Sequence, residues 1–422
     1  MSEMEKSKNE EILVKKYKKS VLTLKISYKS EESCNYFENE IVTMIEKEIE
    51  DLYENYIIYK YSYNIVMSKN VNFVLDVIPS ELEVSMINIQ NNHILGKCID
   101  MDILYLIDNE VKKINLHNSD EWIMKEVSKY FKSAYNEYLK YIETRDNISY
   151  RVSQEALNAM INEVSAMPSF GLVSPTTMGS HKDMDYYTFL KSSFAITPYI
   201  REMIKVGYSY KRLEEIFKDI RKIGVECEKE MFKATEGVNT HKGMIFLMGI
   251  ISSVVGKVLY DNKTFEYIQE YMKEMVKDIL DDFKKIDTNK PMTHGEKLYI
   301  NDGFTGIRGE IKEGLTVIFN DVLPKYELSA LKNNDLNVQI LLELMSKVED
   351  STIVHRHNIN TLKNVKKDAQ AILSLGGMKT EEGKKEAFLL EKRYIEEYIS
   401  PGGSADLLAI IIFLRNVKGV FF

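Results

Sequence analysis

The chain has 422 residues, of which 44% are hydrophobic and 28% are charged, enough apolar side chain for two packed domains. A net charge of −8 without a long basic tract argues against nucleic-acid binding as the main activity, because such binding needs a basic surface to neutralise phosphates. Three cysteines without a CxxC pair exclude a disulfide framework and a zinc site built from thiolates alone.

The sequence predicts neither secretion nor membrane insertion. Its charged opening, MSEMEKSKNEE, lacks the apolar core of a secretory signal. The most apolar stretch, residues 244–256, is shorter than the ~20 residues that a membrane span needs. We therefore expect a cytoplasmic protein that interacts with neither membrane nor nucleic acid.

Glycine and charge divide the chain into two unlike parts. Only one of the 20 glycines, Gly96, lies in residues 1–150. Those residues hold 26 acidic and 19 basic side chains (net −7), whereas the remainder holds 38 and 37 (net −1). This division predicts two domains.

The first part has a mixed pattern. Residues 20–28, 71–78 and 102–107 are rich in β-branched, aromatic and other apolar side chains, which is typical of strands. Between the first two, residues 33–59 carry apolar side chains at helical spacing. We therefore predict a small α/β domain over residues 1–118.

A helix follows this domain. Asn118 and Glu121 form a capping signal, and apolar side chains then recur with the period of a helix. We expect residues 119–144 to form a helix that links the two domains.

The second part, residues 145–422, is predicted to be an all-α domain, so that the whole chain is mainly α. Nearly every segment has helical periodicity and ends at glycine or proline, and strand-like alternation is almost absent. We expect about nine helices, near residues 151–165, 184–196, 209–235, 243–260, 264–286, 335–348, 359–375, 380–398 and 404–416.

The polar turns between these helices carry the candidate chemistry. In the first turn, Asp183 and Asp185 stand two residues apart before a helix, where their oxygens could hold Mg²⁺. His181, Lys182 and the free N–H groups of the helix start could meet phosphate. The alternative is that Asp183 only caps the helix.

A second turn, GVNTHKG, again leads into a helix. Asn239, His241 and Lys242 offer hydrogen-bond donors around a helix N-terminus, which is an anion site by its geometry. Lys242 in the first turn opposes the helix dipole unless an anion is bound, which favours a functional reading over a simple glycine-capped loop.

Two neighbouring turns, THGEK and GFTGIRGE, add further candidates. Arg308, between two glycines, and Lys297 could bind phosphate. Glu296 or Glu310 could bind metal or accept a proton, and His294 is a candidate catalytic residue. The glycine spacing matches neither GxGxxG nor a P-loop.

The last two turns are EDSTIVHR and SPGGSADLLA. The first offers Arg356 as a phosphate ligand, with a charged loop between helices as the alternative. In the second, Ser404 is a candidate N-cap and nucleotide ligand, and Asp406 falls in a first helical turn, where a carboxylate is favoured in any case.

Together, the motifs HKDMD, GVNTHKG, THGEK, GIRGE, DxTxxHR and PGGSADLLA resemble the triphosphoribosyl-dephospho-coenzyme A synthase family, in this order and over about residues 145–415. The resemblance implies a transferase that joins the triphosphoribosyl group of ATP to the 2′-hydroxyl of 3′-dephospho-CoA and releases adenine. The product is the precursor of a prosthetic group carried by an acyl-carrier subunit, that of citrate lyase or, in relatives, malonate decarboxylase.

This reaction assigns roles to the candidate residues. Mg²⁺ held by Asp183 and Asp185, together with the cationic side chains, would neutralise the triphosphate. A carboxylate would take the proton of the attacking hydroxyl, and Glu163, Glu296 and Glu310 remain alternatives for it. Glu163 precedes the turn that approaches HKDMD, although a surface glutamate would fit the same pattern.

The N-terminal domain resembles phosphoribosyl-dephospho-CoA transferase, the enzyme that loads the prosthetic group onto the carrier protein. The likeness lies in GKCIDMDI, where Asp100 and Asp102 could bind metal or could simply lie at the end of a strand. An early Asn-Ile-Pro-Gly segment and a Cys- and Arg-rich tail that are typical of that family are missing. We predict that this domain has diverged or lost its activity.

Two other functions remain open from the residues alone. The same turns would suit an all-α, metal-dependent nucleotide phosphohydrolase, or a nucleotide-binding regulatory module without catalytic activity. The base, the recipient carrier protein and the oligomeric state are not decided by the sequence.

Overall fold

A computed structural model describes the strands of the first part and most of the second. The described residues are 4–11, 19–28, 60–67, 71–78, 80–93, 98–107, 110–118 and 120–422, apart from Tyr210, 287–296, Leu298, Asn301, Asp302 and Leu328. The chain divides into two compact units, Met1–Thr144 and Arg145–Phe422.

The first unit contains a seven-stranded sheet in the order β1-β3-β4-β2-β5-β6-β7. Its β2 and β5 pair in parallel, and the other neighbours are antiparallel. The strands are β1 (Met4–Glu11), β2 (Lys19–Tyr28), β3 (Lys60–Met67), β4 (Val71–Ile78), β5 (Ser80–His93), β6 (Cys98–Ile107) and β7 (Glu110–Asn118). Strands thus occupy the three predicted segments and four others, whereas the helix predicted within 33–59 lies outside the described residues.

Asp100 and Asp102 do not end a strand. Because β6 runs from Cys98 to Ile107, both aspartates lie within it, where the backbone of Asp102 pairs with Asn88 on one side and Asn115 on the other. The predicted strand began too late because the polar aspartates interrupt the apolar pattern.

One long helix, α3 (Asp120–Val164), replaces the linking helix and the first helix predicted in the second domain. Residues 144–151 contain no glycine or proline that would end a helix, so the helix continues through this polar stretch. The boundary between the two units therefore falls inside a helix.

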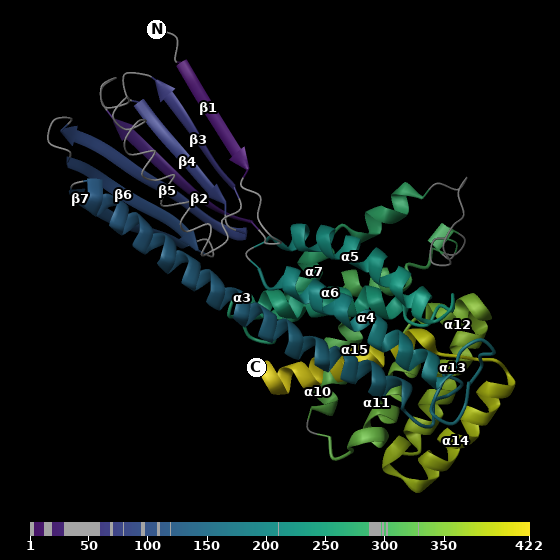
Figure 1. Ribbon diagram of the computed structural model, residues 1–422. Coiled ribbons are helices and arrows are strands. Elements are labelled where there is room, and N and C mark those ends of the chain that lie inside the picture. The colour runs from purple at the N-terminus through teal and green to yellow at the C-terminus, as the bar shows by residue number, and fades with distance from the viewer. Residues whose placement is uncertain are drawn as a thin grey trace. The chain divides into compact units, whose positions relative to one another are not determined.

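The described part of the chain is mainly α, as predicted. After α3 come α4 (Tyr186–Gly207), α5 (Leu213–Ala234), α6 (Lys242–Tyr260), α7 (Tyr267–Met275), η2 (Ile279–Lys285), α9 (Gly306–Lys312), η3 (Val317–Val322), α10 (Leu323–Tyr326), α11 (Asn333–Lys347), α12 (Ser351–Arg356), α13 (Ile359–Ser374), η4 (Gly377–Lys379), α14 (Glu381–Glu396) and α15 (Gly402–Phe421) (Figure 1). The short helices α9, α10 and α12 were not predicted, because one or two turns are too short to show a period.

Helix α6 lies inside the second unit, in contact with α4, α5, α7 and α15 (Figure 1). Glycines bring it close to α4: a Cβ on Gly207 would lie 2.0 Å from the carbonyl oxygen of Ser253, and one on Gly256 would lie 2.7 Å from that of Ile204. Close packing against α4 therefore explains the small side chains on this side of α6.

The helix α6 is longer than the apolar stretch seen in the sequence. Its 19 residues are long and apolar enough to cross a membrane, but 78% of that segment is buried inside the protein. Such burial is typical of a core helix of a globular domain.

Candidate active site

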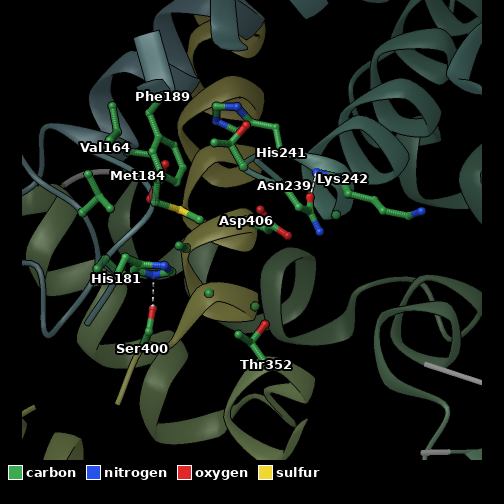
Figure 2. A pocket seen from close by; sticks show the side chains of 18 of the residues that line it. Val164, His181, Met184, Phe189, Asn239, His241, Lys242, Thr352, Ser400 and Asp406 are labelled. Atoms are coloured by element: carbon green, nitrogen blue, oxygen red, sulfur yellow. Dashed lines mark hydrogen bonds between the residues drawn. The ribbon is translucent and has the colours of Figure 1, made fainter. Parts of the chain in front are cut away.

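A cavity of about 520 Å³ collects most of the predicted turns of the second unit. This volume lies in the range of small-molecule sites. The residues that line it come from the end of α3, the turns before α4 and α6, and the starts of α12 and α15; they include Glu163, Val164, His181, Asp183, Met184, Phe189, Asn239, Thr240, His241, Lys242, Gly243, Ile307, Ser351, Thr352, His355, Arg356, Ser400, Gly402, Gly403 and Asp406. Segments more than 200 residues apart thus form one site (Figure 2).

The starts of two long helices face this cavity. Lys242 and Gly243 begin α6, whereas Gly402 and Gly403 begin α15, and all four residues line the cavity. The side chain of the N-cap residue of α6, His241, makes no capping bond. Because helix N-termini carry partial positive charge and free N–H groups, the cavity is suited to an anionic ligand.

His241 lies deep in the cavity wall, with 2% of its surface exposed. Its Nδ1 lies 2.7 Å from Oγ of Ser192, which also accepts a hydrogen bond of 2.7 Å from Oγ1 of Thr240. Ser192 has one hydroxyl hydrogen and two lone pairs, so it can donate to Nδ1 while it accepts from Thr240. In that arrangement the proton of the neutral ring is on Nε2. The edge of the ring packs against Phe189 at 5.0 Å between centroids.

The Nε2 atom of His241 is buried and has no hydrogen-bond partner among the described residues. Burial also lowers the pKa of His241 to about 4, so the ring is neutral at pH 7. His241 therefore offers a neutral ring nitrogen at the cavity, and it supplies no positive charge to neutralise phosphate.

His181 and Arg356 meet across the cavity mouth from distant segments. The guanidinium of Arg356 donates to Nδ1 of His181 at 3.1 Å, so Nε2 carries the hydrogen and donates to Oγ of Ser400 at 3.3 Å. Burial, followed by the nearby charge of Arg356, lowers the pKa of His181 to about 4. His181 is therefore a neutral residue that positions Arg356.

Two carboxyl groups, Glu163 and Asp406, line the same cavity. Glu163 is 7% exposed in the last turn of α3, and burial, with a second contribution from the charge of Asp406, raises its pKa to about 8. Burial, with a second contribution from Asp350, also raises the pKa of Asp406 to about 8. Raised carboxyl pKa values in a cavity are typical of acid–base catalysis.

Gly243 leaves the room that Asp406 occupies. A Cβ at position 243 would lie 2.2 Å from Oδ2 of Asp406, far inside contact distance. A side chain at this position of the GVNTHKG turn would therefore displace the carboxyl group of Asp406.

Asp350 holds two helix starts together. Its carboxylate accepts hydrogen bonds from the backbone N–H groups of Thr352, Ile353, Gly403 and Ser404, and from the hydroxyl of Ser404. Thus Ser404 is not the N-cap of α15, as we expected, but a buried residue within the helix that donates to Asp350. It does not belong to the residues that line the cavity.

The two aspartates of HKDMD have different surroundings. Oδ1 of Asp185 accepts from the backbone N–H and the hydroxyl of Thr188 at 2.8 and 2.7 Å, which caps α4 and lowers the pKa of Asp185. Asp183 is exposed and lines the cavity. Among the described residues, no group of three or more His, Cys, Asp or Glu side chains is arranged to hold a metal.

The predicted lysine ligands are engaged by protein groups. Nζ of Lys242 forms an ion pair of 2.9 Å with Glu228, and its side chain extends away from Asp406 (Figure 2). Lys182 stacks its ammonium over the ring of Tyr398 at 5.2 Å. Asn239, by contrast, lines the cavity while its Oδ1 accepts from the backbone of Lys242 at 3.4 Å.

The remaining candidates that the structure describes do not line this cavity. Arg308 lies over the ring of Phe283 at 5.1 Å. Glu310 lines a separate cavity of about 420 Å³, where burial raises its pKa to about 7. Lys297 is exposed, and His294 and Glu296 lie outside the described residues.

The sequence did not identify Asp406 and Thr352 as residues that line the cavity, nor Asp350 and Ser192 as residues that hold its lining in place. Asp406 was explained by the helix dipole alone, although it follows two glycines in a turn that matches the family. Ser192 gave no signal, because a serine inside an amphipathic helix is common.

Comparison with known proteins supports the resemblance seen in the sequence. The family of ATP:dephospho-CoA triphosphoribosyl transferases matches residues 149–420, and that of apo-citrate lyase phosphoribosyl-dephospho-CoA transferases matches residues 3–120. No solved structure matches the chain significantly.

Three relatives carry the name "Probable 2-(5''-triphosphoribosyl)-3'-dephosphocoenzyme-A synthase". The protein from Streptococcus mutans is 32% identical over 297 residues, which are 66% of this chain and 99% of the relative. Those from Vibrio cholerae and Photobacterium profundum are each 36% identical, over 64% and 68% of this chain and 89% and 93% of the relatives. The chain therefore belongs to the family of ATP:dephospho-CoA triphosphoribosyl transferases.

Proposed function

We propose that the helical unit, residues 145–422, transfers the triphosphoribosyl group of ATP to the 2′-hydroxyl of 3′-dephospho-CoA and releases adenine in the cavity between α3, α6 and α15. Membership of the transferase family favours this reaction over hydrolysis of a nucleotide and over a regulatory module without catalysis. The product would be the precursor of the citrate lyase prosthetic group.

The observation that carries the location of the site is the unsatisfied Nε2 of His241. A buried hydrogen-bond donor without a partner lowers the stability of the protein by roughly 1–3 kcal/mol. We therefore expect a ligand that accepts a hydrogen bond from Nε2 at this point of the cavity. The acceptors available in the substrates are phosphate and ribose oxygens and the ring nitrogens of adenine. His241 would bind one of these as a neutral donor.

Arg356 and Asn239 would supply the other polar contacts. Arg356 is oriented by His181 and can bind phosphate with two N–H groups. Asn239 lies beside the start of α6, where free N–H groups favour an anion. Lys242 can contribute only by leaving Glu228, and Lys182 only by leaving the ring of Tyr398.

Mg²⁺ fits the site through Asp183 and not through Asp185. Mg²⁺ in nucleotide sites commonly takes one or two carboxylates and completes its shell with phosphate and water. Asp183 faces the cavity, whereas one oxygen of Asp185 already accepts both capping bonds of α4. When bound with ATP, the ion would neutralise phosphate charge, and Asp183 would fix its position.

For the first unit, we propose an α/β domain, residues 1–118, that descends from the carrier-loading transferase, joined by residues 119–144 to the synthase domain. The family match over residues 3–120 supports this descent. It also favours the acyl-carrier subunit of citrate lyase as the recipient of the prosthetic group. The proposal includes a cytoplasmic location, because the apolar helix α6 is mostly buried inside the protein.

Incubation of the full chain with ATP, Mg²⁺ and 3′-dephospho-CoA tests the function of the helical unit. We expect stoichiometric release of adenine and formation of a triphosphoribosyl adduct, both resolved by chromatography and mass spectrometry. Formation of ADP or AMP without adenine would instead indicate a phosphohydrolase. Binding of ATP without turnover would indicate a regulatory module.

Transfer of the prosthetic group onto the carrier protein tests the activity of the first unit. Chemically prepared prosthetic-group precursor and an apo acyl-carrier subunit are incubated with the chain, and the mass of the carrier is measured. We expect no loading, because key segments of the transferase family are missing. Loading that Asp102→Ala abolishes would show an active second enzyme.

A further inference from the structure

Glu163 and Asp406 meet in the cavity from opposite kinds of helix end. Glu163 occupies the last turn of α3, and Asp406 lies five residues after the N-cap of α15. Both side chains line the cavity, and the causes that raise their pKa values are burial and a neighbouring carboxylate, without an opposing cation or hydrogen bond. Two acidic groups therefore lie at the cavity without a cation to balance their charge.

The helix ends distinguish the two groups. The carbonyl end of α3 carries partial negative charge and disfavours ionisation of Glu163, whereas Asp406 lies in the second turn of α15, where no helix carbonyl end opposes its ionisation. The charge of Asp406 in turn contributes to holding the proton on Glu163. Because the charge of Asp406 opposes ionisation of Glu163, Glu163 keeps its proton after Asp406 has lost its own.

Their positions are set by the tertiary structure. Gly243 leaves room for Oδ2 of Asp406, and Asp350 ties the start of α15 to α12 through Gly403 and Ser404. Asp406 lies in the second turn of α15 and not, as we expected, in the first, so the helix dipole alone does not explain its place at the cavity. This arrangement preorganises the pair for chemistry in the cavity.

We propose that Asp406 is the general base and Glu163 the general acid of triphosphoribosyl transfer, an inference that rests on the proposed function of the cavity. Asp406 takes the proton of the 2′-hydroxyl of dephospho-CoA as that oxygen forms a bond to the anomeric carbon of the ATP ribose. Glu163 gives its proton to the adenine ring as the bond between this carbon and the adenine nitrogen breaks.

The proton balance closes within the pair. The reaction moves one proton from a hydroxyl to adenine, so one proton enters at Asp406 and one leaves from Glu163. Transfer of the remaining proton from Asp406 to Glu163 then restores the starting state. No further acid, base or oxidant is required.

The test uses the full chain with ATP and with ATP methylated at N7 of adenine. The methylated base carries a positive charge in the substrate and leaves as a neutral molecule, so it needs no acid. Glu163→Gln and Asp406→Asn are compared with wild type and with Glu155→Gln, a matched change two turns earlier on α3 that does not line the cavity. Release of the base and formation of the adduct are measured.

With ATP, we expect both variants to lose about 10²–10⁴-fold in kcat, the usual contribution of one acid or base, and Glu155→Gln to match wild type. With the methylated substrate, Glu163→Gln should return to within about tenfold of wild type, whereas Asp406→Asn should stay at least about 10²-fold slower. Equal losses on both substrates in Glu163→Gln, or recovery of Asp406→Asn, would overturn the assignment. Absence of adenine release by wild type would instead overturn the transferase function itself.

A measurement on the wild-type chain covers the case in which a variant fails to fold. Carbon-13 in the side-chain carboxyl groups of glutamate allows a protonated carboxylic acid to be observed directly by NMR. At pH 7 in the ATP-free protein, we expect Glu163 to remain protonated and Glu310, whose pKa burial raises to about 7, to be partly protonated. The signal of Glu310 is assigned by its loss in Glu310→Gln. If every other glutamate carboxyl is ionised at pH 7, Glu163 cannot be the acid.

Discussion

Asp350 and Ser404 lie 54 positions apart, and one carboxylate oxygen of Asp350 accepts both the backbone N–H and the hydroxyl of Ser404, at 2.8 and 3.0 Å. The other oxygen accepts from the first turn of α12 at Thr352 and Ile353. One buried side chain therefore caps two helices whose first residues line the active-site cavity.

Asp350→Ala is expected to lower the free energy of unfolding by about 3–5 kcal/mol, because it leaves several buried N–H groups without an acceptor. Chemical denaturation followed by circular dichroism measures the change. Asp335→Ala, at the exposed start of α11, should cost less than about 1 kcal/mol, since it removes only a surface ion pair with Lys384. Equal effects of the two changes would contradict the capping role of Asp350.

Gly243→Ala should reduce kcat/KM at least about tenfold, because the added Cβ would displace Asp406. The free energy of unfolding should change by less than about 1 kcal/mol, since alanine is itself favoured in a helix. Gly419→Ala in α15 is the matched control, because a Cβ there meets no atom within 4 Å.

If the loss arises through Asp406, the two changes are not additive. In the Asp406→Asn background, Gly243→Ala should have little further effect on kcat/KM. A full additional tenfold loss in the double variant would show that Gly243 acts elsewhere in the site.

Ser192→Ala should weaken ATP binding by about fivefold to tenfold, the value of one hydrogen bond, because Nδ1 of His241 loses the donor that selects the Nε2–H form. Isothermal titration of the full chain with ATP measures the dissociation constant. Ser193→Ala is the matched control, since the hydroxyl of Ser193 donates to the carbonyl of Phe189 within α4. A similar loss in both variants would rule out the proposed action through His241.

We expect the protein to become less stable at low pH because His241 is buried in its neutral form. Its pKa is about 4 in the folded chain and 6.5 in an unfolded one, so between these values the unfolded chain binds more protons. The contribution of His241 to the free energy of unfolding is therefore largest above pH 6.5. About 3 kcal/mol of it is lost as the pH falls to about 4.

His241→Gln, which keeps a donor near the position of Nε2 but does not titrate, should remove this part of the pH dependence. Thermal unfolding at pH 7.0 and 4.5 measures the difference between variant and wild type. An unchanged difference between the two pH values would show that His241 is not buried in its neutral form.

The helical half of the chain and its family could be predicted because the relevant signals are local. Apolar side chains repeat along each long helix of the second unit, and each family motif is a short run of residues at a helix start. Even so, periodicity did not reveal that α3 is one helix, because the domains were separated by composition, and it could not reveal the single turns of α9 or α12.

The sequence predicted individual residues of the candidate site, but not which of them lie together in the folded chain. The sequence identified Glu163, His181, Asp183, His241 and Arg356 as candidates, and the structure places these five around one cavity. It also identified Glu310, Arg308 and Ser404, which lie elsewhere. Residue type and local spacing do not distinguish the two groups, because both occupy polar turns beside helices.

By itself, the sequence determined the class of fold, the family, and the turns that carry polar chemistry. Only the tertiary structure decided which site residues are charged at pH 7 and which of them line the same cavity. Burial, which depends on the packing of distant helices, makes His241 neutral and raises the pKa of Glu163. Packing of α15 against Gly243 brings Asp406 to the cavity, and no local pattern encodes a contact between residues so far apart in the chain.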